Sequence, residues 1–116
     1  MKIMLISETA SINNSLAYFC AQEHAFLVVY RLPLKALDNM SEIRPDIIVI
    51  NAVDFPRHWK VLMHCLNSEY KNFALKKVLL IGANFNSDDF KKAEFLKVDL
   101  LLRSFTHGDW EKLKSL

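Results

Sequence analysis

The chain has 116 residues, and its 52% hydrophobic and 24% charged residues are typical of one globular domain with a real core, which excludes a disordered chain. The formal net charge of +2 gives no electrostatic case for nucleic-acid binding. The longest apolar runs, such as VLLIGA, are too short to span a bilayer, and the opening MKIMLIS lacks a signal-peptide cleavage site. We therefore expect a single domain over residues 1–116, located in the cytoplasm and making no membrane contact.

Cysteine and glycine are both scarce. Cys20 and Cys65 are the only cysteines, and we expect two reduced, buried thiols rather than a disulfide framework. Gly82 and Gly108 are the only glycines, and two separated glycines cannot build a P-loop or a dinucleotide-binding loop.

Five short apolar runs alternate with segments of helical spacing. The runs predict strands at 2–7, 25–32, 46–52, 77–83 and 99–104. The segments between and after them predict five helices at 11–24, 33–45, 56–70, 87–97 and 106–116. Ser11 and Ser87 are the expected N-caps of the first and fourth helices, and Pro45 is expected to end the second.

This alternation predicts an α/β fold with a parallel sheet between two helical layers, because parallel strands need right-handed crossovers. The flavodoxin-like version of this three-layer sandwich has the strand order 2-1-3-4-5. Its functional crevice lies at the carboxyl ends of the strands. In this chain those ends hold Ser7, Glu8, Asn51, Ala52, Gly82 and Arg103.

Over its whole length the sequence resembles a receiver (CheY-like) domain of a bacterial response regulator. The most specific stretch is VDLLLRSFTHGDWEKL, in which Arg103, Ser104 and Phe105 stand where the family has lysine, proline and an aromatic residue. The family's first strand and the acid pair after it are similar to KIMLISE. Its third strand and phosphoacceptor are similar to RPDIIVINAVDFP, and its fourth strand is similar to KVLLIGA. The resemblance implies a signalling module of a two-component system that is not an enzyme and carries no cofactor.

The phosphorylation chemistry of that family needs a magnesium ion held by acids, an acceptor aspartate and a lysine. Here the acid pair is Ser7-Glu8, and the acceptor position is Asn51 or Ala52, depending on the register of a loop that is one residue longer than usual. Neither Asn51 nor Ala52 can form an acyl phosphate.

The positions that report the phosphoryl group have changed as well. Gly82 replaces the hydroxyl residue, Leu100 replaces the aromatic switch, and Arg103 replaces the lysine. We therefore expect a pseudo-receiver that binds no metal and works without phosphorylation.

Three alternatives stay open. Asp54 can serve as the acceptor of a conventional receiver if the longer loop folds inward. The emptied crevice, lined by Asn51, Gly82 and Arg103, can hold an anion or a nucleotide as a small-ligand sensor. A flavin site is a weaker alternative, suggested only by the Ser/Thr/Asn-rich stretch SETASINNS after the first strand.

The resemblance also implies where partners bind. Receiver domains use the surface of their fourth helix, fifth strand and fifth helix to dimerise or to contact an output domain, so we expect a homodimer or an output-domain contact here. The domain itself is not expected to bind nucleic acid, and it is expected to be the N-terminal regulatory part of a longer protein. The residues expected on this surface are Phe90, Lys91, Glu94, Phe95, Lys97, Arg103, Trp110 and Glu111.

Overall fold

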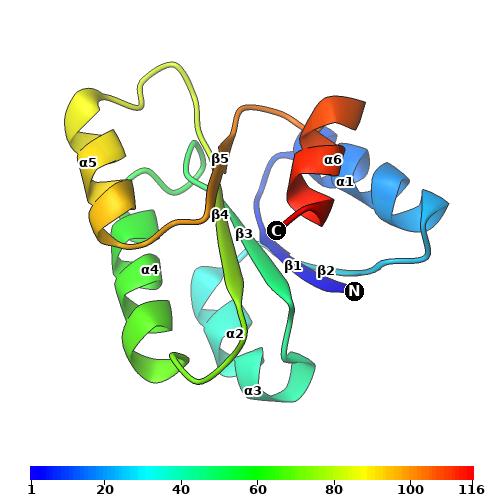
Figure 1. Ribbon diagram of the computed structural model, residues 1–116, viewed down its shortest axis with the longest axis horizontal. Coiled ribbons are helices and arrows are strands. Elements are labelled where there is room, and N and C mark those ends of the chain that lie inside the picture. The colour runs from blue at the N-terminus through cyan, green and yellow to red at the C-terminus, as the bar shows by residue number, and fades with distance from the viewer.

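The computed structural model describes all residues, 1–116, and strands and helices alternate along the chain as expected (Figure 1). The strands are β1 (Lys2–Ile6), β2 (Phe26–Tyr30), β3 (Ile47–Asn51), β4 (Lys76–Leu80) and β5 (Leu100–Leu102). The helices are α1 (Ala10–Gln22), α2 (Pro33–Asp38), α3 (Met40–Ile43), α4 (His58–Glu69), α5 (Ser87–Phe95) and α6 (His107–Lys114).

All five strands are parallel and follow the predicted order β2-β1-β3-β4-β5. The central strand β3 is buried along its whole length, which explains why IIVIN is a continuous apolar run up to its last residue. The edge strand β2 has a mixed pattern of half-buried and exposed residues, because it has a neighbour on one side only.

Helices cover both faces of the sheet. Helices α1 and α6 lie on one face, and α2, α3, α4 and α5 lie on the other (Figure 1). Each face has its own hydrophobic core, with Trp110 and Leu16 in the first and Trp59 and Met63 in the second. The flavodoxin-like sandwich is thus confirmed.

The structure has six helices rather than the expected five. The helix expected at 33–45 divides at Asn39, which follows α2 and precedes α3 with φ −105° and ψ 3°. The second piece ends at Arg44, which takes a left-handed conformation with φ 50° immediately before Pro45. Pro45 ends the helix as expected, because the residue before a proline is disfavoured in the α conformation.

Two predicted N-caps are wrong by a few residues. Helix α1 begins after Thr9 rather than Ser11, and α5 begins after Asn86 rather than Ser87. Asn86 forms a reciprocal capping box with Asp89, because the side chain of each residue accepts a hydrogen bond from the backbone N–H of the other. None of the helices has the length and apolar character that crossing a bilayer requires.

Candidate functional site

The carboxyl edge of the sheet is organised around Asn51, the last residue of β3. Its side chain is buried, with only 2% exposure, and its amide Nδ2 donates a hydrogen bond to Ser7 Oγ at 3.2 Å. Its Oδ1 accepts hydrogen bonds from the backbone N–H groups of Val53 at 3.0 Å and Asp54 at 3.4 Å. Asn51 therefore joins the end of β1 to the end of β3 and fixes the turn that follows β3.

The loop after β3 folds inward and brings Asp54 to the start of α1. One carboxylate oxygen, Oδ2, accepts hydrogen bonds from the Glu8 backbone N–H at 2.7 Å and from Ser7 Oγ at 3.3 Å. The other, Oδ1, accepts a hydrogen bond from Thr9 Oγ1 at 2.8 Å. Thr9, the N-cap of α1, makes no capping bond with its own side chain, so Asp54 supplies the negative charge at this helix N-terminus.

Gly82 follows β4, and the side chain of Val53 covers it. A Cβ atom at Gly82 would stand 2.9 Å from Val53 Cγ2, closer than carbon atoms approach without displacement. The volume that a hydroxyl side chain at position 82 would need is thus filled by the loop after β3.

The hollow beside Gly82 has a volume of about 190 Å³ and is lined by residues of the β3–α4 and β4–α5 loops. Trp59 and Phe85 form its aromatic wall, with ring centroids 5.5 Å apart. Asp89 is the only charged residue that lines it, and Lys60 Nζ pairs with that carboxylate at 3.1 Å. With no cation in its lining, this hollow is poorly suited to an anionic ligand.

The residues at this edge do not fit the magnesium ion that receiver chemistry uses. Mg²⁺ requires oxygen ligands in near-octahedral geometry. The Asp54 carboxylate and the Asn51 amide are already engaged in hydrogen bonds, and Glu8 is the one remaining carboxylate. Nowhere in the chain do three His, Cys, Asp or Glu residues gather in a metal-binding arrangement.

The other expected site residues lie apart from this network. Arg103 is exposed and forms no ion pair with Glu8, since the ion pairs of the structure involve other residues. Ala52 is buried, and Leu100, the first residue of β5, is half-buried.

The expected interaction surface is exposed, with one exception. Phe95 is 74% exposed and Phe90 is 40% exposed. Lys91, Glu94, Lys97, Arg103 and Glu111 are also exposed.

Trp110 is the exception, with an exposure of 1%, so its assignment to the surface is corrected. Its ring stacks on Phe19 with centroids 5.9 Å apart, and its Nε1 donates to the Glu23 carboxylate. Trp110 therefore packs α6 against α1.

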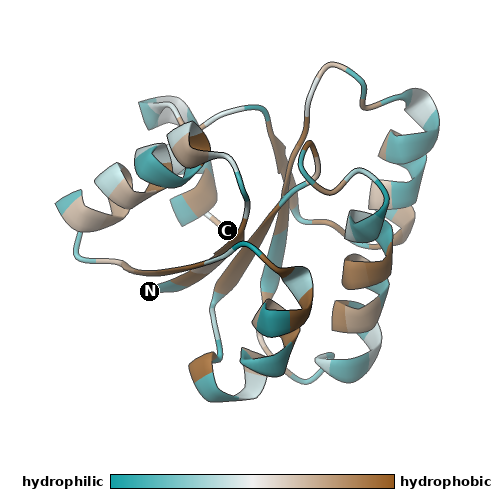
Figure 2. Ribbon diagram, turned by 180° about the vertical axis from the view of Figure 1, so that it is seen from behind, coloured by the Kyte–Doolittle hydropathy of each residue, from teal (hydrophilic) through white to brown (hydrophobic).

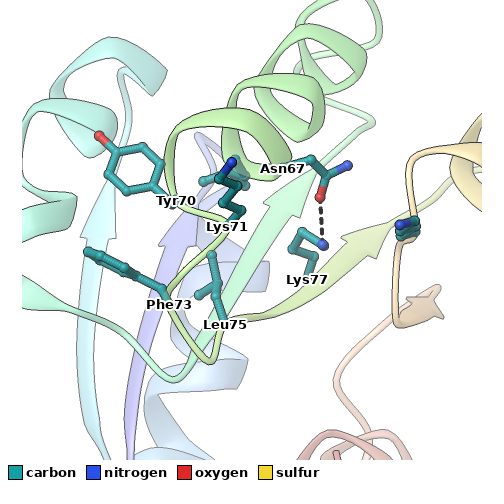
Figure 3. Close-up of a pocket in the computed structure, with 8 residues that line it drawn as sticks. Asn67, Tyr70, Lys71, Phe73, Leu75 and Lys77 are labelled. Atoms are coloured by element: carbon teal, nitrogen blue, oxygen red, sulfur yellow. Dashed lines mark hydrogen bonds between the residues drawn. The ribbon is translucent and has the colours of Figure 1, made fainter.

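A different pocket, of about 310 Å³, opens at the amino end of β4 (Figure 3). Lys71, Lys77 and Lys97 line it together with Tyr70 and Phe73, and no acid does. Helices α4 and α5 both end beside it, and the carbonyl groups at helix C-termini carry partial negative charge. Lys77 Nζ donates a hydrogen bond to Asn67 Oδ1 at 2.7 Å, so one of the three lysines is engaged by a side chain of α4.

Comparison with known proteins shows which family this chain belongs to. Residues 1–98 match the TP_0454_N family, described as an N-terminal domain. An uncharacterized protein of Treponema pallidum (strain Nichols) is 64% identical over 36 residues. That match covers 31% of this chain and only 16% of the length of the relative.

Several solved structures that are similar to this chain are receiver domains or response regulators. The signal receiver domain of a Bermanella marisrubri response regulator has a TM-score of 0.85 at 12% identity, covering 99% of this chain and 96% of that one. The receiver domain of a DNA-binding response regulator from Colwellia psychrerythraea 34H has a TM-score of 0.82 at 15% identity, with coverages of 99% and 95%. Chemotaxis response regulator CheY4 of Vibrio cholerae has a TM-score of 0.81 at 10% identity, with coverages of 98% and 95%. The chain therefore belongs to the TP_0454_N family of N-terminal domains, and its fold is that of response-regulator receiver domains.

Proposed function

We propose that this chain is a pseudo-receiver, a regulatory module that acts through protein–protein contacts and does not take up a phosphoryl group. The observation that carries the proposal is the hydrogen-bond network of Asp54. The loop after β3 brings this carboxylate to the carboxyl edge of the sheet, where both of its oxygens accept hydrogen bonds from residues 7–9.

Phosphoryl transfer to a carboxylate needs a free oxygen in line with the donor, together with cations that neutralise the phosphoryl oxygens. Attack by Asp54 would compete with the bonds to Glu8 and Thr9, which hold the carboxylate in place and lower its nucleophilicity. The donor set does not suit Mg²⁺, and no cation lines the hollow beside Gly82. The same two facts weigh against a small-ligand sensor for anions at this edge.

A conventional receiver phosphorylated on Asp54 is the second candidate. The inward fold of the loop favours it, because it brings the Asp54 carboxylate to Ser7 and Thr9 at the carboxyl edge. The two candidates differ in whether Asp54 is a reactive group or an anchor for the loop.

For the partner surface we propose α5, β5 and α6, with Phe95 at its centre and Lys91, Glu94 and Lys97 around it. The 74% exposure of Phe95 supports this, because a large aromatic side chain in water is stabilised by burial. This surface would contact either a second copy in a homodimer or an output domain of the same protein. The protein would act in the cytoplasm. The description of the family as an N-terminal domain supports a following output region.

Incubation with acetyl phosphate and Mg²⁺, followed by intact-mass measurement, tests the function. We expect no phosphoryl adduct on the wild type or on the matched Asp54→Asn variant. An adduct on the wild type that is missing from Asp54→Asn would establish the conventional receiver. Sedimentation of wild type and Phe95→Ser tests the dimer separately, since Phe95→Ser is expected to shift the protein toward monomer.

A further inference from the structure

An apolar groove of about 480 Å³ runs between α2 and α4. Phe55 and Leu62 form its floor and are buried, whereas Leu34 of α2 and Val61 of α4 form its walls. Both helices carry hydrophobic segments in Figure 2. None of the residues that line the groove belongs to the α5, β5 and α6 surface. Its floor residue Phe55 donates its backbone N–H to the Asn51 carbonyl at 3.1 Å.

The walls of this groove are unusually exposed for their residue types. Leu34 is 75% exposed, Val61 is 68% exposed, and Leu32 at the entrance to α2 is 55% exposed. Single exposed leucines are common, but three large aliphatic side chains around one concave apolar surface mark a binding site. Covering them would remove apolar area from water, which favours association.

The charges around the groove indicate what covers it. Lys35 and His58 are the only basic residues that line it, and no carboxylate does. Arg31 and Arg57, their neighbours at the starts of the two helices, are exposed, and none of these four residues forms an ion pair. The groove therefore has a basic end with no internal acid to neutralise it.

The dipole of helix α4 adds to this charge. Helix α4 follows the parallel strand β3, so it begins at the carboxyl edge of the sheet, beside Arg57. Helix N-termini carry partial positive charge. The acids at the other ends of the two helices are Asp38 and Glu69.

We propose that this groove binds an amphipathic helix of a partner protein, with acidic residues beside its apolar stripe. A groove between two helices is concave and accepts a convex helical ridge, whereas a second copy would present the same concave surface. The apolar stripe would contact Leu34, Val61 and Leu62, and the acidic residues would lie over Lys35 and Arg57. The inference rests on the proposed function as an interaction module and names the chemistry of a partner.

The probe for the test is a fluorescent peptide of about 18 residues, long enough to hold a helix, with leucine at i, i+3, i+4 and i+7 and glutamate beside them. A second peptide has lysine in place of every glutamate. Each is titrated by fluorescence anisotropy into the full chain, into Val61→Glu, and into Tyr18→Glu, a matched control at an exposed residue of α1 on the other face of the sheet. Val61 is mostly exposed, so the Val61→Glu variant is expected to fold, and circular dichroism checks this.

The glutamate peptide is expected to bind at least about tenfold more tightly than the lysine peptide. Val61→Glu is expected to weaken binding of the glutamate peptide by about tenfold or more, whereas Tyr18→Glu should bind it as the wild type does. Equal binding of the two peptides, no binding, or binding indifferent to Val61→Glu would overturn the inference. So would a homodimer that dissociates on Val61→Glu, because the occupant would then be a second copy. The acetyl phosphate experiment does not depend on the groove, so failure here leaves that test of the pseudo-receiver intact.

Discussion

The side chain of Val53 lies directly against Gly82, with Cγ2 only 2.9 Å from the point where a Cβ atom at Gly82 would stand. Gly82, which has no Cβ, and the loop that covers it are therefore matched to each other. The loop conformation depends on Asn51, which binds the Val53 N–H, and on Asp54, which binds the start of α1. The glycine at position 82 and the inward fold of the loop after β3 are thus parts of one arrangement.

Restoring a side chain at position 82 tests this match. Gly82→Thr is expected to lower the free energy of unfolding by about 1–2 kcal/mol, because the new Cβ overlaps Val53. Val53→Ala should relieve the overlap, so the double variant should recover at least about 0.5 kcal/mol of that loss. Urea unfolding of the four proteins of this cycle provides the measurement. Strictly additive effects would show that Val53 does not occupy the space at position 82.

An aspartate at position 51 is expected to destabilise the protein. Asn51→Asp removes the amide that donates to Ser7 and places a carboxylate where exposure is only 2%. The free energy of unfolding at pH 7 should fall by about 2–4 kcal/mol. Asn51→Ala is the matched comparison without charge. Unchanged stability of Asn51→Asp would contradict the structural role given to Asn51.

Removing the carboxylate of Asp54 should loosen the start of α1. Asp54→Ala is expected to lower the free energy of unfolding by about 1–3 kcal/mol, because it deletes the acceptor of hydrogen bonds from Ser7, Glu8 and Thr9. Hydrogen exchange at the Glu8 and Thr9 amides should speed up, while exchange in α6 stays as in the wild type. Exchange that changes equally everywhere would indicate only global destabilisation.

The capping box of α5 predicts a pH dependence of stability. The backbone N–H of Asn86 lowers the pKa of Asp89 below its usual 3.8, with a smaller contribution from Lys60 and with desolvation acting in the opposite direction. Because the pKa is lower in the folded state, the stabilisation is complete above pH 3.8 and is lost as the pH falls through the folded-state pKa.

Asp89→Asn should therefore lower the free energy of unfolding by about 0.5–1 kcal/mol at pH 7. Below pH 3.8 the free energies of unfolding of the variant and the wild type should approach each other. Urea unfolding at several pH values from 7 to 3 measures it. Asp88→Asn, in the same helical turn but outside the capping box, is the control and should have the smaller effect. A difference that stays constant down to pH 3 would exclude Asp89 as its source.

The two cysteines should differ in reactivity. Burial raises the pKa of Cys20 to about 11 and leaves its side chain 2% exposed. Burial also raises the pKa of Cys65, together with a hydrogen bond to Glu69, but Cys65 is half-buried in the α2–α4 groove. Iodoacetamide at pH 8 should modify Cys65 first and Cys20 only after unfolding, as peptide mapping would show. Modification of Cys20 first in the folded protein would be incompatible with this core.

The sheet and its order could be predicted because buried parallel strands have a simple signature. The run IIVIN is continuous in the sequence and buried throughout in the structure. The division of the second helix at Asn39 could not be predicted in this way, since helical spacing of apolar residues continues across it. Trp110 was misplaced for a related reason: a helix near the end of the chain has two faces, and only the packing on Phe19 and Glu23 shows which one is buried.

The sequence predicts which residues lie at the candidate site, but it does not predict the hydrogen bonds that these residues make. Asn51 and Gly82 follow directly from the ends of two strands. The inward turn of Asp54 depends on an Asn51 side chain that binds two backbone N–H groups and on the β1–α1 loop, which lies more than 40 positions away. Val53 gave no signal of its own, because an exposed valine in a loop has many possible orientations.

The central claim is that Asp54 anchors a loop and does not accept a phosphoryl group. Amide NMR shifts during titration with millimolar Mg²⁺ and then with beryllofluoride, a mimic of an acyl phosphate, test it most directly. We predict that the amides of Glu8, Thr9, Asp54 and Gly82 stay in place. Saturable shifts at these four amides that extend into α5 would contradict the account and make Asp54 the phosphoacceptor of a working receiver.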